Sequence, residues 1–264
     1  MTSFLEAGDS SPVIVCGNPR SGTRMHANIL NTHPDIVITD EFHAIEQSRA
    51  MLSEFRRNCL LKKFPRNKVL PRQTYLAKMI WLAYSVDRIA ERGATAKIIG
   101  NKTPQIERKY KILENIFRNA PPKYVYCLRS APKVLRSVKN LSNLRWNRDS
   151  IETNLKRYIK SVECLEEMQA AFPARVCVSV LDHLAPGTPN SVFFAPVFDF
   201  VGVELDDAIR ADLDAMGAQN TMDAVKKITG RQDDATVELT EEELNYIVNF
   251  PRYIEIKEKY NLKH

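Results

Sequence analysis

The chain has 264 residues, of which 44 % are hydrophobic, so it is long enough to build one sizeable core as a single domain spanning residues 1–264. Its formal net charge of +6 favours anionic ligands. Its five cysteines lack C-x-x-C spacing and its five histidines lack metal-ligand spacing, which argues against a disulfide framework and a metal site.

The sequence shows no signal peptide, and no apolar run approaches the ~18 residues of a membrane span. We therefore expect a cytoplasmic protein without a transmembrane segment. A lumenal domain separated from its membrane anchor would show the same features.

Residues 12–30 predict a strand, a tight loop and a helix in succession. Val13-Ile14-Val15 is a β-branched run typical of a buried strand, and residues 17–22 are rich in loop formers. From Thr23 onward, apolar residues recur at helical spacing. Such a unit points backbone N–H groups and a helix dipole at a phosphate. A simple strand-to-helix turn is the alternative.

The loop departs from a nucleotide-hydrolysing P-loop in one important respect. Gly17 and Gly22 have the G-x-x-x-x-G spacing, but Thr23 and Arg24 replace the Lys and Ser or Thr that follow in those enzymes. The lysine that bridges phosphates and the hydroxyl that binds Mg²⁺ are therefore missing. This pattern favours an anion-binding loop without magnesium chemistry.

A second short strand, 36–38, brings polar residues to its end. Asp40, Glu41 and His43 follow it, and ligands of open α/β sheets bind at the carboxyl ends of strands. Because Asp40 and Glu41 are adjacent, an extended segment would point them to opposite faces, with Glu41 and His43 on the same face. Alternatively, Glu41 caps the next helix.

Residues 44–97 predict a helical insertion with a strongly basic part. Residues 49–78 contain nine Lys and Arg and one acidic residue, Glu54, with aromatic residues between them. Charge runs of this kind usually form a solvated helical face. Nucleic acid is a possible partner of this stretch, but no motif for reading nucleic acid accompanies the charge. An acidic acceptor or an anionic membrane surface is an equally good alternative.

Two further strand ends carry cations. Residues 96–102 predict a strand ending at Lys102, and a helix is expected over 105–119. Residues 124–128 form a strand ending at Arg129, followed by a helix starting at Pro132 that places Ser137 about two turns along. Arginine offers a planar fork to a phosphate and serine adds a neutral donor.

The remaining residues read mainly as structure. We expect a helix over 150–171 and a strand over 175–181. Thr240 and Glu243 form a capping box at the start of a last helix. Residues 220–231 contain Lys, Arg and Gly that could close a ligand site.

Taken together, these motifs resemble the PAPS-dependent sulfotransferases, which use 3′-phosphoadenosine 5′-phosphosulfate (PAPS). Pro19-Arg-Ser-Gly-Thr23 after a strand is similar to their 5′-phosphosulfate loop, and Arg129 with Ser137 to their 3′-phosphate motif. His33-Pro-Asp-Ile36 with an acidic residue after it, and the Lys102 turn, resemble the tyrosylprotein and carbohydrate branch. The resemblance covers roughly residues 12–202. Arg24-Met-His26 and residues 180–184 depart from the family pattern.

The resemblance implies a P-loop-like three-layer α/β fold with a central parallel sheet flanked by helices. It implies transfer of a sulfuryl group from PAPS to a hydroxyl acceptor, or with less support to an amine. The implied catalytic residues are Glu41, Arg20, Lys102 and His43, with Glu41 or His43 as base. The implied cofactor-binding residues are Arg20, Ser21, Gly22, Thr23, Arg24, Arg129 and Ser137.

No metal is expected, and the acceptor could be a small molecule, carbohydrate, lipid or peptide. Two other functions stay open from the residues alone. One is a small-molecule kinase or nucleotide hydrolase that uses the same loop. The other is a non-catalytic binding protein that uses the basic stretch.

Overall fold

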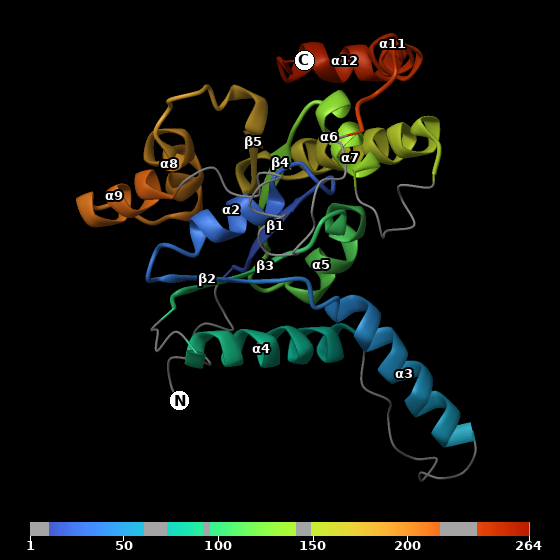
Figure 1. Cartoon of the computed structure of the whole chain (residues 1–264). Coiled ribbons are helices and arrows are strands. Elements are labelled where there is room, and N and C mark those ends of the chain that lie inside the picture. The colour runs from blue at the N-terminus through green and yellow to red at the C-terminus, as the bar shows by residue number, and fades with distance from the viewer. Residues whose placement is uncertain (1–10, 61–72, 92–95, 141–148, 217–236, 264) are drawn as a thin grey trace.

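The computed structural model describes residues 11–60, 73–91, 96–140, 149–216 and 237–263. In this part of the chain a five-stranded parallel sheet forms the centre, and helices pack on both of its faces (Figure 1). The predicted α/β class, with a central parallel sheet between helices, is confirmed.

The strands lie in the order β2-β3-β1-β4-β5 across the sheet. They are β1 Val13–Gly17, β2 Ile36–Thr39, β3 Ile98–Lys102, β4 Lys123–Leu128 and β5 Val176–Val180. Each overlaps one of the predicted strands. Val15 pairs with Lys102 and Gly17 with Cys127, so the end of β1 lies beside the ends of β3 and β4.

Helices connect the strands and complete the chain. They are α2 Thr23–Leu30, α3 Ala44–Leu60, α4 Gln73–Glu91, α5 Tyr110–Ile116, α6 Ala131–Lys139, α7 Ile151–Ala171, α8 Asn190–Val201, α9 Asp207–Ala215, α11 Glu241–Val248 and α12 Pro251–Lys259, with 3-10 helices η1 Ile106–Lys109, η3 Pro173–Arg175 and η4 Leu181–His183. The single helix predicted over 105–119 is thus η1 followed by α5. The predicted capping box of α11 is confirmed, and α6 begins at Ala131, one residue before Pro132.

The sheet separates two hydrophobic clusters, because side chains alternate between its faces. Val13 and Val15 of β1 pack with α2, α8 and α9 on one face. Ile14 and Cys16 pack on the other face with the cluster that includes α4, α5, α6, α7 and α12. Burial on both faces explains why the strands are continuous apolar runs.

The candidate site follows from the connections of the sheet. The chain leaves β1 toward β2 and β3 on one side, and leaves β4 toward β5 on the other. Ligands of open α/β sheets bind beyond the strand ends where the direction of connection reverses, which here is between β1 and β4. Residues 18–22 follow β1, and Arg129 follows β4.

Two other expectations concern the whole chain. Cys16, Cys127 and Cys164 are buried free thiols, and Cys177 is a partly buried one, in line with the argument against a disulfide framework. Across the described ranges, no helix is both long and apolar enough to cross a membrane.

Candidate functional site

The loop after β1 has a backbone that requires glycine at both ends. Gly17 has φ +127°, and a Cβ there would lie 2.3 Å from the Cys127 carbonyl oxygen. Gly22 has φ +94° and is the N-cap of α2, where no side chain caps the helix. Ser21 closes the loop, because its hydroxyl donates to the Asn18 carbonyl at 2.6 Å. The first N–H groups of α2 are therefore left for an anion.

Two arginines meet beside this loop. Arg20 Nε donates to Ser137 Oγ at 2.8 Å, and Arg129 Nη1 lies 3.4 Å from the Arg20 carbonyl oxygen, which accepts from it. Burial lowers the pKa of Arg20, and the charges of Arg129 and Arg24 lower it further. Burial and Arg136 lower the pKa of Arg129, while Asp182 raises it.

This arrangement is suited to a polyanion. Within the described residues, neither Arg20 nor Arg129 forms an ion pair with a carboxylate. Two close cations that form no ion pair repel each other, so an anion between them would be stabilised. The contact of Arg20 with Ser137 shows that the two predicted phosphate motifs adjoin each other.

A second charged group lies at the ends of β2 and β3. Lys102, whose side chain is 3 % exposed, contacts Glu41 Oε1 at 2.7 Å and also contacts Asp40 Oδ1. The expectation that Asp40 and Glu41 point to opposite faces is therefore wrong. Because β2 ends at Thr39, the two residues are no longer part of an extended strand, and both carboxylates turn to the same lysine.

Asn101 fixes this strand end. Its side-chain amide donates to the Asp40 carbonyl at 2.8 Å, and its oxygen accepts from the Thr103 hydroxyl at 2.7 Å. His43 lies apart from the pair, since it is exposed and has φ 49° at the start of α3. The structure thus brings Glu41 and Lys102 together and leaves His43 in solvent.

Sequence reasoning missed a buried carboxyl group beneath the loop. Glu107, in η1, is 0 % exposed; its Oε2 accepts from the Gly17 N–H at 3.2 Å, and its Oε1 accepts from the Ser161 hydroxyl. Ser161 in turn shares a 2.7 Å hydrogen bond with the Tyr126 hydroxyl. Burial raises the pKa of Glu107, against the effect of its hydrogen bonds with Ser161 and Gly17. Glu107 thereby holds the backbone where the loop begins.

His26 holds the other end of the loop. Its Nδ1 lies 2.9 Å from the Gly22 carbonyl oxygen and its Nε2 lies 2.7 Å from Ser179 Oγ. Since a carbonyl oxygen only accepts, Nδ1 donates to Gly22, and Nε2 accepts from the Ser179 hydroxyl. Burial lowers the pKa of His26 to about 4, despite the bond to Gly22. The neutral ring therefore joins α2 to β5. In the sequence, the available signal for this role was that His26 is a polar residue among the apolar residues of the predicted helix.

Asp182 positions the segment that carries Arg129. Its side chain, 1 % exposed, accepts from the Ser130 N–H at 2.5 Å and pairs with Lys133 at 2.7 Å. The Tyr158 hydroxyl donates to the Arg129 carbonyl at 2.9 Å. Asp182, which lies in the segment 180–184 that departs from the family pattern, thus supports the turn between β4 and α6.

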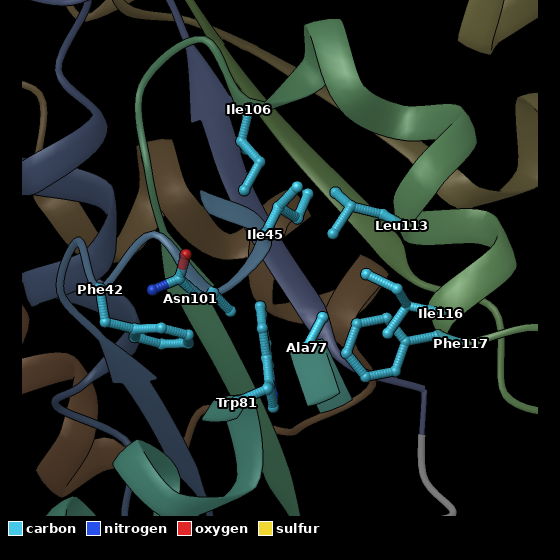
Figure 2. A pocket seen from close by; sticks show the side chains of 10 residues that line it. Phe42, Ile45, Ala77, Trp81, Asn101, Ile106, Leu113, Ile116 and Phe117 are labelled. Carbon is cyan, nitrogen blue, oxygen red and sulfur yellow. The ribbon is translucent and has the colours of Figure 1, made fainter. Parts of the chain in front are cut away.

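An apolar cavity of about 10 Å³ lies beside Phe42, the residue after Glu41 (Figure 2). It is lined by Phe42, Ala44, Ile45, Ala77, Trp81, Asn101, Ile106, Leu113, Ile116 and Phe117. Trp81 contacts both Phe42 and Phe117 edge to face. The volume has room for about one water molecule, so the cavity is a gap in the core and not an acceptor pocket. Its aromatic packing fixes Phe42 next to Glu41.

Two expectations fall partly or wholly outside the described residues. Residues 220–231 lie outside them, as does the part of the basic stretch over 61–72. Of the basic stretch, Arg49, Arg56 and Arg57 are exposed on α3. No group of three or more potential metal ligands occurs among the described residues.

Comparisons with known proteins agree with this geometry. A sequence model of the sulfotransferase family matches residues 12–181. The sulfotransferase STF9 of Mycobacterium avium is similar in structure, with 14 % identity and a TM-score of 0.53 over 99 % of this chain and 80 % of that one.

Two sulfotransferase domains are also similar in structure. The domain of the Synechococcus PCC 7002 olefin synthase has 14 % identity and a TM-score of 0.55, over 97 % of both chains. The domain of the curacin biosynthetic pathway has 13 % identity and a TM-score of 0.55, over 96 % of this chain and 98 % of that one. These likenesses show a shared fold.

Proposed function

Because the chain belongs to the sulfotransferase family, we propose that it transfers a sulfuryl group from PAPS to a hydroxyl group of an acceptor. The observation that supports PAPS best is the pair of half-buried arginines, Arg20 and Arg129, which stand at neighbouring strand ends without an ion pair among the described residues. A donor with phosphate groups at both its 5′ and 3′ ends would supply the missing negative charge.

The residues present fit such a donor. Residues 20–24, with the open N-terminus of α2, would hold the 5′ phosphosulfate end. Arg129 and Ser137, on the adjacent strand end and helix, would hold the 3′ phosphate. PAPS, when bound, supplies an activated sulfuryl group whose leaving group is a phosphate.

The chain's own residues would assist the transfer by position and charge. Lys102 and Arg20 would neutralise the charge that develops on the leaving phosphate. Glu41 is the base, since its side chain is 38 % exposed and next to Lys102, so that it can take the proton of an incoming hydroxyl group. His43, exposed two residues away, would orient the acceptor.

The acceptor is a compound with a hydroxyl group, drawn from small molecules, carbohydrates, lipids or peptides. Exposed Arg49, Arg56 and Arg57 on α3 would favour one that carries negative charge.

The test is ligand-induced stabilisation. PAPS and its desulfated product PAP, at about 100 times the dissociation constant and without metal, should raise the melting temperature by about 5 °C. ATP lacks the 3′ phosphate and should do much less. Arg129→Ala should abolish this preference, whereas Arg118→Ala, a change of an exposed arginine after α5, should keep it.

Two results would overturn the proposal. Equal stabilisation by ATP that needs magnesium would indicate a kinase or nucleotide hydrolase. Salt-sensitive nucleic-acid binding, with no shift from any of the three nucleotides, would indicate a basic binding protein. If the nucleotides bind as expected, radiolabelled PAPS and a panel of acceptors identify the acceptor class.

A further inference from the structure

Asp40 bridges two cations that belong to different parts of the site. Its Oδ1 contacts Lys102 Nζ at the end of β3, and its Oδ2 lies 3.5 Å from Arg24 Nη2 in the first turn of α2. Glu41 also contacts the lysine, at 2.7 Å. One carboxylate therefore links the strand end that carries the proposed base to the helix that carries the proposed phosphosulfate loop.

The bridge is held in place from both sides. Asn101 donates to the Asp40 carbonyl, which fixes the backbone. Lys102 is almost fully buried, so it cannot leave the carboxylate by turning into solvent. Burial raises the pKa of Asp40, but the hydrogen bond and charge of Lys102, with a smaller effect of Arg24, lower it overall, so the group is ionised at neutral pH.

Arg24 needs a partner of this kind. It stands in the first turn of a helix, where the dipole disfavours a cation, and near Arg20, whose pKa its charge lowers. Asp40 supplies a counter-charge at 3.5 Å.

We propose that Asp40 is an internal anion that competes with the sulfuryl end of the donor for Lys102 and Arg24, and so sets how strongly the site distinguishes donor from desulfated product. This inference rests on the proposed function. Donor and product share both phosphate positions and carry about the same total charge, because the 5′ phosphate of the product is itself close to a dianion at neutral pH. Only in the donor does part of the 5′ charge lie farther out, on the sulfuryl oxygens. A carboxylate between the two cations therefore disfavours the donor more than the product.

The experiment compares Asp40→Asn with Asp35→Asn. Asp35 also pairs with a lysine, Lys97, at 2.7 Å, but at the opposite end of β2 and β3. Dissociation constants for PAPS and PAP are measured by calorimetry at one low ionic strength, because salt screens the interaction. Unfolding curves first establish that both variants are folded.

Asp40→Asn should increase the preference for PAPS over PAP about three- to tenfold, a modest factor because Asp40 is 63 % exposed and its charge is partly screened. Asp35→Asn should leave this ratio unchanged. Arg24→Ala, which removes one of the two cations, should lower the ratio, and it serves as the second variant if Asp40→Asn does not fold.

An unchanged or lower preference for PAPS over PAP in Asp40→Asn overturns the inference, and so does an unchanged preference in Arg24→Ala. In both cases the proposed function stands. A wild-type protein that binds neither nucleotide overturns both.

Discussion

Replacing Glu107 tests whether the loop is held from beneath. Glu107→Ala removes the acceptor of the Gly17 N–H and of the Ser161 hydroxyl, in a place with no exposure to water. An unsatisfied buried donor costs about 1–3 kcal/mol, and the cavity left by the side chain adds roughly 1–2 kcal/mol. We therefore expect a loss of about 2–5 kcal/mol in the free energy of unfolding.

Glu107→Gln separates shape from charge. The amide oxygen can still accept from Gly17 and the amide nitrogen can donate to Ser161, so the loss should be about 1 kcal/mol. Urea unfolding followed by circular dichroism measures both variants. Glu163→Gln, a change of a partly exposed residue on the same helix as Ser161, is the control and should cost less than about 0.5 kcal/mol.

The same variant gives a pH test with a definite sign. Burial raises the pKa of Glu107 above its ordinary 4.5, so the folded state binds more protons than the unfolded state in that window. The stability of the wild type relative to Glu107→Gln should therefore fall as the pH rises from 4.5 through the raised value. A loss below about 1 kcal/mol in Glu107→Ala, together with a flat pH difference, would refute the supporting role.

Three further predictions concern the site itself. Arg20→Ala and Lys102→Ala should each slow turnover ~10²–10³-fold in folded protein, and near-normal rates would exclude that residue from the chemistry. Glu41→Gln should lower turnover ~10²–10⁴-fold while PAPS still binds, and His43→Ala should do less; the reverse order would make the histidine the base. Burial lowers the pKa of His26 to about 4, so the unfolded state binds a proton at a higher pH than the folded state, and the free energy of unfolding should decrease as the pH falls from 6.5 to 4. In urea titrations, His26→Asn should reduce this decrease. An equal decrease in the variant would show that other groups cause it.

The fold was predictable because its local signals agree. Each strand is a run rich in apolar residues, and a parallel sheet buries such runs on both faces. The sequence also predicted a tight loop from its two glycines. The structure shows why glycine is needed at the first of them, since Gly17 approaches Cys127 too closely for a side chain. The charged residues at strand ends were found because polar groups that interrupt apolar runs mark the edge of the sheet.

The contacts between these residues were less predictable. The two carboxylates that follow β2 converge on Lys102 because the strand stops at Thr39, and strand ends are a feature that periodicity locates poorly. Glu107 reaches Gly17 across 90 residues of sequence, and His26 reaches Ser179 across 153. Pairings over such separations depend on the order of the strands, which no local pattern contains.

The two helix N-termini at the switch between β1 and β4 indicate how a donor with phosphates at both ends would lie. At α6, Asp182 already accepts the Ser130 N–H, and Pro132 has no N–H to offer, so little backbone is left for a ligand. At α2, the cap is Gly22 and no side chain satisfies the first turn. More of the first-turn backbone is therefore available at α2, which suits the phosphosulfate end. We therefore propose that the 3′ phosphate is bound by side chains, with Arg129 as the residue on which donor selectivity depends.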